Sequence, residues 1–502
     1  MAELKEIMIS VDDFEARVAI LEKERLAEIY VERNDAPSIM GNIYLGRVSS
    51  ILPGMDAAFV DIGQEKSAFL CVGEVVFPEE VDSLPQKIHY FLKPGQDILV
   101  QVAKGPMGTK GARVTAQIAL PGRHLVLLPF GDSVGVSRRL SEDERERLRI
   151  LCEGIKPDDM GLIARTAAQG VGLEWLKSDL KYLIRTWRNL QRQAEKSKAP
   201  KAIYREEGLA LRAARDIFTS DFIQLVIDSP KEYKKIQTFL SETSPGLKDR
   251  VKLYSGSIPL FEKYNVDSQL RKALRRRIWL RSGGYITIDT TEALTAIDVN
   301  TGKYVGKTSL QRTILKTNLE AAREIADQIR LRDIGGIIVI DFIDMEDQKD
   351  REKVFSALNE ALAMDRAKTN VGEFSEFGVV EMTRKKFWQG LLESLCAPCL
   401  SCEGSGVMLS DTAAGIEAWR GIKGFCRAKS SEALLFKVHP RVINFLAARR
   451  AKLRKRMGRD VYLYGDPTYS PEGYELVSEG SHRKIKRAYK ELCKEYAILH
   501  LT

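Results

Sequence analysis

The 502 residues of the chain are 44% hydrophobic and 29% charged, a composition that supports several buried cores and excludes a largely disordered protein. No apolar run approaches the ~18 residues that cross a bilayer, and the N-terminus lacks an apolar signal stretch, so we expect a cytoplasmic protein without membrane contact. The net charge of +9 lies in residues 410–502, where 19 Lys and Arg face 10 Asp and Glu; this excess suits a nucleic-acid surface but is more often a solvated basic face.

The first 117 residues predict mainly β structure. Extended segments within 4–36 cannot form a core alone, whereas residues 38–117 predict a small barrel of short strands separated by glycines. Phe59 and Phe69 lie on two of these strands, with Lys104 and Lys110 nearby. Aromatic rings interleaved with cations grip single-stranded nucleic acid, although each phenylalanine taken alone is more often a core residue.

Residues 118–273 carry mixed patterns. Strand and helix signals alternate over 118–190, and the polar stretch 191–201 indicates a linker or a helix end. We expect a domain boundary near 205–210. Beyond it the clearest element is a strand at Phe222–Ile227, which we interpret as part of the sheet begun by the N-terminal strands.

The most regular patterns occupy residues 274–395. Two strands are predicted at Tyr285–Asp289 and Leu294–Ile297, followed by a long helix that is stopped by Gly335 and Gly336. The apolar run Ile337–Ile340 then predicts a buried strand. Asp298 and Asp341 directly follow two of these strands.

Active sites of α/β sheets lie at the carboxyl ends of strands, where both aspartates fall. Carboxylates without neighbouring histidine or cysteine favour Mg²⁺ or Mn²⁺, and residues 125–438 contain no histidine, so a metal must generate any nucleophile. Asn300 lies on the same side of the chain as Asp298 and is positioned to orient a carboxylate or a phosphate, and Asp344 is a spare acid. The alternative is that each aspartate is a turn former or helix cap.

The cysteines at 399 and 402, followed by glycines at 404 and 406, have the spacing of half a zinc knuckle. A tetrahedral site needs four ligands. Cys396 is a candidate third ligand, but no second Cys-x-x-Cys pair exists, so a site shared between two chains is an attractive explanation; the alternative is three unligated thiols. The basic runs at 275–277 and 449–459 either contact the phosphates of a nucleic-acid backbone or form solvated helix faces.

Five segments together resemble the bacterial ribonuclease E/G endoribonucleases. Residues 41–48 with 57–61 resemble the S1 domain of the family, residues 296–300 and 340–345 its catalytic strands, and the cysteine segment its zinc link. The resemblance covers essentially the whole chain. It implies an α/β multidomain fold with these parts: an RNase H-like subdomain split between 1–37 and 211–273, an inserted S1 (OB) barrel at 38–117, a 5′ sensor at 118–210, a DNase I-like catalytic subdomain at 274–395, a zinc link at 396–409 and a small α/β domain at 410–502.

The resemblance also implies an activity. Family members cut single-stranded, often A/U-rich RNA and leave a 5′-phosphate and a 3′-hydroxyl. Asp298 and Asp341 match the Mg²⁺ ligands and Asn300 the supporting residue, while Phe59, Phe69 and Lys110 match the S1 contacts to RNA. Cys399 and Cys402 match structural Zn²⁺ ligands that meet the same pair from a second protomer, which implies a homodimer and leaves a homotetramer open.

A preference for a 5′-monophosphate is a further implication. The family's sensor pattern is present as Gly122, Val126, Arg165 and Thr166, a guanidinium fork and a hydroxyl that suit a terminal phosphate; Lys368 replaces a further arginine of the E branch. The chain is similar to the short G-type branch, whose substrates are 16S ribosomal RNA precursors and messenger RNA. The rival hypothesis is a non-catalytic RNA-binding assembly factor.

Overall fold

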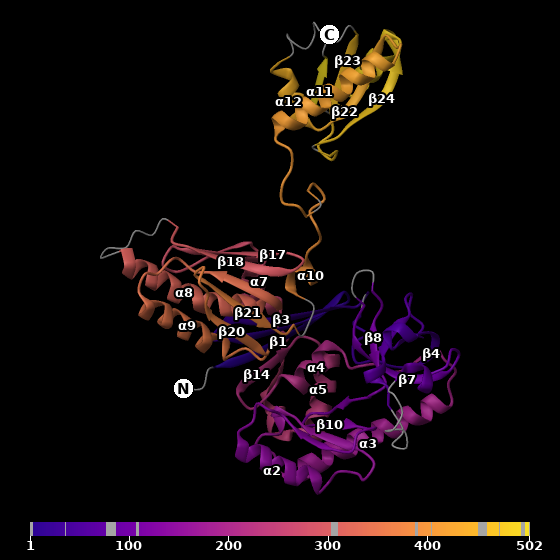
Figure 1. Ribbon diagram of the computed structural model, residues 1–502, viewed down its shortest axis with the longest axis vertical. Coiled ribbons are helices and arrows are strands. Elements are labelled where there is room, and N and C mark those ends of the chain that lie inside the picture. The colour runs from indigo at the N-terminus through magenta and orange to yellow at the C-terminus, as the bar shows by residue number, and fades with distance from the viewer. Residues whose placement is uncertain are drawn as a thin grey trace. The chain divides into compact units, whose positions relative to one another are not determined.

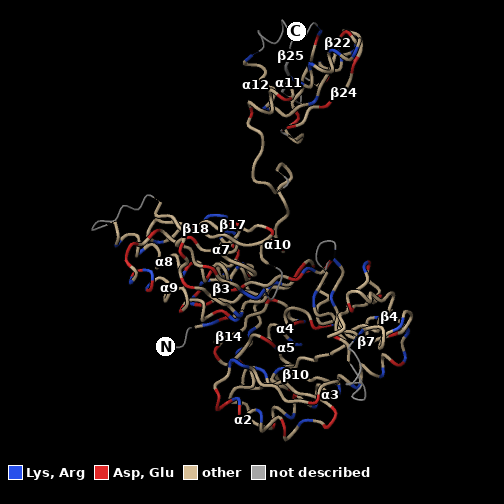
Figure 2. The backbone as a smooth tube through the Cα atoms, in the orientation of Figure 1, with Lys and Arg blue, Asp and Glu red and all other residues tan. Residues whose placement is uncertain are grey.

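The computed structural model describes residues 4–35, 37–76, 87–106, 110–302, 310–386, 390–402, 404–449, 459–470, 472–492 and 497–500. The chain forms two compact units, Met1–Leu395 and Cys396–Thr502, and both mix helices with sheets (Figure 1). Lys and Arg are interspersed with Asp and Glu along the elements of the first unit (Figure 2). Within the described ranges, no helix combines the length and the apolar character that a membrane span requires.

The N-terminal strands belong to a five-stranded sheet with the order β15-β14-β1-β2-β3. β1 pairs antiparallel with β2 and parallel with β14, so the predicted strand at Phe222–Ile227 is confirmed and extends the sheet begun by the first strands. Two pairs of helices, α4 with α5 and α6 with α7, cover its two faces. The bounds are β1 (Lys5–Val11), β2 (Glu15–Glu22), β3 (Arg25–Arg33), β14 (Phe222–Ile227), β15 (Val251–Leu253), α4 (Leu209–Asp216), α5 (Pro230–Thr243), α6 (Leu260–Lys263) and α7 (Val266–Ala273).

The predicted small barrel is confirmed as a closed five-stranded barrel. Its strands follow the order β4-β5-β6-β8-β7, and pairing of β4 with β7 closes it. Val48, Val60 and Leu70 fill its interior. The bounds are β4 (Ile43–Leu52), β5 (Ala57–Asp61), β6 (Ala68–Cys71), β7 (Asp97–Lys104) and β8 (Arg113–Thr115); a further strand, β13 (Lys201–Tyr204), adds to the outside of β4.

A four-stranded sheet with the order β11-β12-β10-β9 follows the barrel. Its core includes apolar side chains of α2 and α3. The expected linker or helix end at 191–201 is the last turn of α3 and a short connection to β13. The bounds are β9 (Leu120–Pro121), β10 (Leu125–Leu128), β11 (Val134–Val136), β12 (Gly161–Ala164), α2 (Glu142–Glu153) and α3 (Leu173–Glu195).

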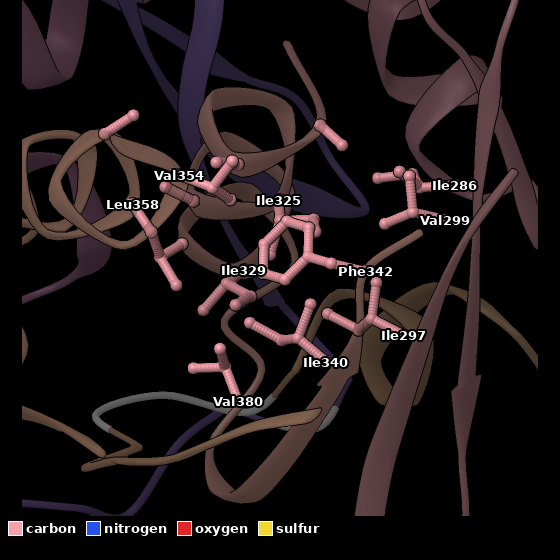
Figure 3. Close-up of a cluster of buried hydrophobic side chains, with 14 of the residues drawn as sticks. Ile286, Ile297, Val299, Ile325, Ile329, Ile340, Phe342, Val354, Leu358 and Val380 are labelled. Atoms are coloured by element: carbon pink, nitrogen blue, oxygen red, sulfur yellow. The ribbon is translucent and has the colours of Figure 1, made fainter. Parts of the chain in front are cut away.

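The last sheet of the first unit has six strands in the order β16-β17-β18-β19-β21-β20. Helices α8 and α9 pack on one face, where side chains such as Ile297, Ile325 and Ile340 point toward one another (Figure 3). The expected stop of the helix at Gly335 and Gly336 is wrong, because α8 ends four residues earlier. The bounds are β16 (Arg277–Trp279), β17 (Tyr285–Thr290), β18 (Leu294–Asn300), β19 (Gly336–Asp341), β20 (Thr369–Phe374), β21 (Val379–Arg384), α8 (Leu310–Leu331) and α9 (Gln348–Leu362).

The second unit contains a four-stranded sheet with the order β24-β22-β23-β25. Helices α11 and α12 pack on one face and α14 on the other. The bounds are β22 (Ala433–Val438), β23 (Asp460–Gly465), β24 (Tyr474–Gly480), β25 (Ala497–His500), α11 (Asp411–Ala428), α12 (Pro440–Ala447) and α14 (His482–Leu492). Residues 450–458 of the basic run lie outside the described residues. The domain boundaries drawn from the sequence stay predictions.

Candidate functional site

The two candidate aspartates lie opposite one another at the end of a parallel ladder. β18 pairs with β19, and Asp298 is the register partner of Asp341. Ile297 and Ile340, one residue earlier, are buried against the helices, so the aspartates point to the other face of the sheet, where both are exposed. The sheet is thus buried on its helix-covered face only, and alternation along β18 and β19 places both carboxylates on the accessible face.

Asn300 is held beside Asp298. Its Nδ2 donates a hydrogen bond to Asp298 Oδ2 at 2.5 Å, and its position two residues further along β18 puts it on the same face. The turn before β17 packs closely here, because a Cβ on Gly284 would lie 2.7 Å from the carbonyl oxygen of Asn300. The structure thus brings together the three residues expected from the sequence, and their catalytic role stays a prediction.

Negative charge accumulates around Asp341. Partial burial raises the pKa of its carboxyl, and the charges of Asp298 and Asp344 raise it further. Among the described residues, no lysine or arginine forms an ion pair with any of the three acids. Anions that repel one another and have no protein cation nearby favour a bound divalent cation.

The donors at this face fit magnesium. They are carboxylate and amide oxygens, which hard cations prefer. Within the described part of the chain, no group of three or more His, Cys, Asp or Glu residues is arranged to hold a metal, and the register partners at this face are two carboxylates. Two carboxylates with remaining positions for water and phosphate oxygens are a common arrangement for Mg²⁺.

Four side chains form one row across the barrel. Phe59 of β5 pairs with Phe69 of β6, which pairs with Arg113 of β8, which pairs with Lys104 of β7. The two rings lie edge to face with centroids 6.0 Å apart, and both are half-buried, whereas the two cations are exposed. Arg113 was missed in the sequence because its place in the row depends on strand register.

Lys110 is exposed just before β8. The next residue has to be glycine for steric reasons, because a Cβ at Gly111 would lie 2.3 Å from the backbone oxygen of Ser67. This close approach keeps Lys110 next to the segment that leads into β6. The barrel therefore presents two aromatic rings and three cations.

The residues expected to sense a 5′-phosphate lie around β9, β10 and β12. Arg165 Nη1 donates to the carbonyl oxygen of Gly122 at 2.6 Å and lies 2.7 Å from Asp216 Oδ1. The hydroxyl of Thr166 lies 2.8 Å from that of Ser137. Val126 lies on β10 opposite Ile163, within the same sheet. The structure thus gathers four of the five expected residues.

Lys368 is exposed in the connection before β20. Its carbonyl oxygen accepts a hydrogen bond from the Lys385 N–H, and among the described residues no hydrogen bond joins its side chain to the other four expected sensor residues. Its predicted share in sensing the phosphate therefore rests on the family pattern alone.

Asp179 of α3 anchors this region and was not singled out from the sequence. The side chain is fully buried, and its carboxylate accepts hydrogen bonds from the backbone N–H groups of Arg123, His124 and Leu125. A Cβ on Gly122 would lie 2.6 Å from Asp179 Oδ2, so only glycine fits beside it. An acid within the apolar stripe of a helix was the available signal, since carboxylates are rarely buried without partners.

The cysteine segment has the local geometry of a metal-binding knuckle. Hydrogen bonds from the backbone N–H of Cys402 and Ser401 lower the pKa of the Cys399 thiol. Two glycines follow with φ of +90° and +71°, a conformation that other residues rarely adopt. Within the described residues no group of three or more metal-binding side chains is found here, and the zinc site stays a prediction.

Comparison with known proteins identifies the family. A profile of the Ribonuclease E/G family matches residues 119–387. Ribonuclease G of Haemophilus influenzae is 40% identical over 485 residues, which are 94% of this chain and 99% of the relative; Ribonuclease G of Escherichia coli strain K12 is 40% identical over 484 residues with the same coverage. Ribonuclease E of a Nostoc species is 40% identical over 402 residues, 78% of this chain and 58% of the relative.

The chain belongs to the ribonuclease E/G family. It is an endoribonuclease, and the segment that matches the family profile contains both aspartates, Asn300 and all five expected sensor residues. The match over 99% of Ribonuclease G, against 58% of Ribonuclease E, agrees with similarity to the short branch of the ribonuclease E/G family. The alternative of a non-catalytic RNA-binding assembly factor is therefore wrong.

Proposed function

We propose that this ribonuclease E/G member uses Mg²⁺ to cut single-stranded RNA at the sheet face that carries Asp298 and Asp341. The observation that carries the proposal is that the two aspartates are register partners in the β18–β19 ladder. Two hard oxygen donors on an accessible face, which form no ion pair with a lysine or arginine among the described residues, suit an ion that shares its coordination with a phosphate.

Each of the three residues has a separate task. Asp298 and Asp341 would hold Mg²⁺, which when bound neutralises charge on the scissile phosphate and lowers the pKa of nearby water. Asn300 keeps the Asp298 carboxylate in one orientation through the bond from Nδ2. Water adds to phosphorus as the bond to the 3′ oxygen breaks, so the products carry a 5′-phosphate and a 3′-hydroxyl.

The substrate is a strand without secondary structure, often A/U-rich. The barrel supports a single-stranded substrate, because aromatic platforms with neighbouring cations bind single strands of varied sequence. The residues concerned are Phe59, Phe69, Arg113, Lys104 and Lys110. Gly122, Val126, Arg165, Thr166 and Lys368 are proposed to favour a 5′-monophosphate. Likeness to Ribonuclease G supports processing of the 16S ribosomal RNA 5′ end and messenger decay as roles.

Assembly completes the proposal. Cys399 and Cys402 would bind Zn²⁺ together with the same pair from a second copy and so form a homodimer. The two-thiol knuckle within one chain supports a shared site, because tetrahedral zinc needs four ligands. Whether dimers associate into tetramers is decided by surfaces outside this knuckle.

The test of catalysis uses a 5′-monophosphorylated, labelled, single-stranded oligoribonucleotide. Asp298→Asn and Asp341→Asn should each lower cleavage by at least about 100-fold while RNA binding persists, because they remove ligands without disturbing the barrel. Asp344→Asn, which keeps both ligands, should retain most activity. Cleavage by both ligand variants at the wild-type rate, or wild-type cleavage that EDTA leaves unchanged, would reject the proposal.

A further inference from the structure

An aromatic group adjoins the two carboxylates on the open face of the catalytic sheet. Trp279 of β16 is the register partner of Tyr285 of β17, and Tyr285 is the partner of Asn300 of β18. Arg277, two residues before Trp279, projects on the same face. These three residues, Arg277, Trp279 and Tyr285, are termed the aromatic platform.

Trp279 contributes little to the core. The side chain is 62% exposed, whereas the neighbours on either side, Ile278 and Leu280, pack into the cluster beneath the sheet. The indole contacts Tyr285 edge to face, with ring centroids 5.3 Å apart and an angle of 63° between the planes. A large exposed indole held in place by a second ring presents a flat face to solvent at little entropic cost on binding.

A cation completes the platform. The guanidinium carbon of Arg277 lies 4.2 Å from the centroid of the Tyr285 ring, and within the described residues Arg277 forms no ion pair. Its neighbour Arg276 differs, because its Nε and Nη2 donate to the two carboxylate oxygens of Asp289. The charge of Arg277 is therefore available to an anionic ligand.

The platform begins on the strand next to the carboxylates: Tyr285 lies beside Asn300, and Trp279 and Arg277 lie one strand further, about 10 Å from β18. Residues directly opposite across a ladder have Cβ atoms about 4.5–5.5 Å apart, and residues two apart along a strand are separated by roughly 7 Å. Tyr285 is opposite Asn300, and Thr287, two residues further along the same strand, is opposite Asp298, which is opposite Asp341. Arg277 is in this second row, as the partner of Thr287.

We propose that the aromatic platform is a base-stacking subsite, which holds one nucleobase of single-stranded RNA next to the scissile phosphate while Arg277 faces the phosphate of that nucleotide. The inference rests on the proposed function and adds a second contact to the strand besides the barrel. Stacking is tolerant of base identity, so the subsite fixes the register of the backbone over Asp298 and Asp341 without selecting a sequence. These residues bind and position RNA and take no part in the chemistry.

Cleavage of abasic substrates tests the subsite. In a series of oligoribonucleotides that each lack one base, wild type should lose efficiency most when the missing base adjoins the cleavage site. Trp279→Ala should cut the intact substrate about 5- to 100-fold less efficiently than wild type does. Removal of the base next to the cleavage site should not lower the cleavage efficiency of this variant further. Trp279→Phe should recover part of the loss. Trp175→Ala, which removes a 41% exposed indole from α3, should behave as wild type.

A binding measurement separates this inference from the proposed function. With 2-aminopurine as the base next to the cleavage site, Asp341→Asn should quench its fluorescence by stacking, and Asp341→Asn combined with Trp279→Ala should not. If wild type quenched the 2-aminopurine fluorescence but did not cleave RNA in the presence of Mg²⁺, the proposed function would be rejected and the subsite would still be supported. Cleavage by Trp279→Ala with the wild-type abasic profile, or quenching that survives loss of Trp279, would overturn the subsite.

Discussion

Asp341 carries its charge directly opposite Asp298 and close to Asp344. In the metal-free protein this repulsion opposes folding, and like charges opposite one another in a sheet cost about 0.2–1 kcal/mol. Asp341→Asn should therefore raise the melting temperature in EDTA although it abolishes cleavage, and Mg²⁺ should stabilise wild type more than the variant. Calorimetry with and without Mg²⁺ measures both effects.

Glu381→Gln is the matched control for this prediction. It removes an exposed carboxylate from the neighbouring strand β21, where the register partner is Val339 and not an acid. We expect its melting temperature in EDTA to stay close to that of wild type. A lower or unchanged melting temperature for Asp341→Asn would contradict the repulsion argument.

At the scale of residues, sequence periodicity placed the candidate pair, Asp298 and Asp341, at the ends of two strands, but it did not show the contacts around the expected site residues. The apolar runs before Asp298 and Asp341 predicted that each follows a strand, but the face on which each carboxylate lies came from the structure, because the run Ile337–Ile340 is apolar throughout. Arg113 and Asp179 depend on which strand or loop packs beside them, and no local pattern specifies that pairing. Their contacts to Phe69 and to the loop after Gly122 emerge only with tertiary structure.

The end of α8 shows, at the scale of secondary-structure elements, what sequence patterns predict and what they miss. Periodic apolar positions predicted the helix, and the glycine pair that follows suggested where it stops. Asp333 instead takes the left-handed conformation, with φ of 48°, and the Ile334 N–H donates to the carbonyl oxygen of Ile329. This is a Schellman cap made without glycine, so residue type alone pointed to the wrong position.

A substitution in the loop between β9 and β10 tests whether this loop takes part in sensing the 5′-phosphate. In Gly122→Ala the new Cβ would clash with Asp179, whose carboxylate holds the loop, and would move the carbonyl oxygen that Arg165 contacts. The ratio of cleavage rates for 5′-monophosphate over 5′-hydroxyl RNA should fall by about tenfold, the loss of one charge-assisted hydrogen bond. Cleavage of the 5′-hydroxyl substrate should be retained.

Gly154→Ala controls for a general effect of replacing glycine near this sheet. Gly154 follows α2 with φ of −71°, and a Cβ there would make ordinary contacts at 3.6 Å. This variant should keep the wild-type ratio. If Gly122→Ala kept it as well, the sensing role of the loop would have to be abandoned.

For the whole molecule, the sequence predicted that the first strands need a partner from elsewhere in the chain, because they cannot form a core alone. The strand at Phe222–Ile227 meets that need, with Ile7 as the register partner of Leu225. The segments that cover its two faces could not be derived from periodicity, since any amphipathic helix satisfies the pattern. The family resemblance predicts a subdomain split between 1–37 and 211–273, and that division stays a prediction.

Zinc-mediated dimerisation is the prediction that concerns the whole molecule. If Cys399 and Cys402 hold half of a shared Zn²⁺ site, the double change of both residues to serine should remove bound zinc and halve the mass measured by light scattering. Metal and mass should change together, because binding of the ion and pairing of the chains are one equilibrium. Each species needs metal analysis and sizing in the same buffer.

Cys396→Ser distinguishes a shared four-thiolate site from a three-cysteine site within one chain. Cys396 is exposed, and neighbouring backbone N–H groups in the knuckle lower the pKa of the Cys399 thiol. With two cysteines from each of two chains, Cys396→Ser should keep half a zinc ion per chain and the dimer mass. One zinc per wild-type chain that falls to none in Cys396→Ser would instead place the whole site within a single protomer, and the dimer would then require another interface.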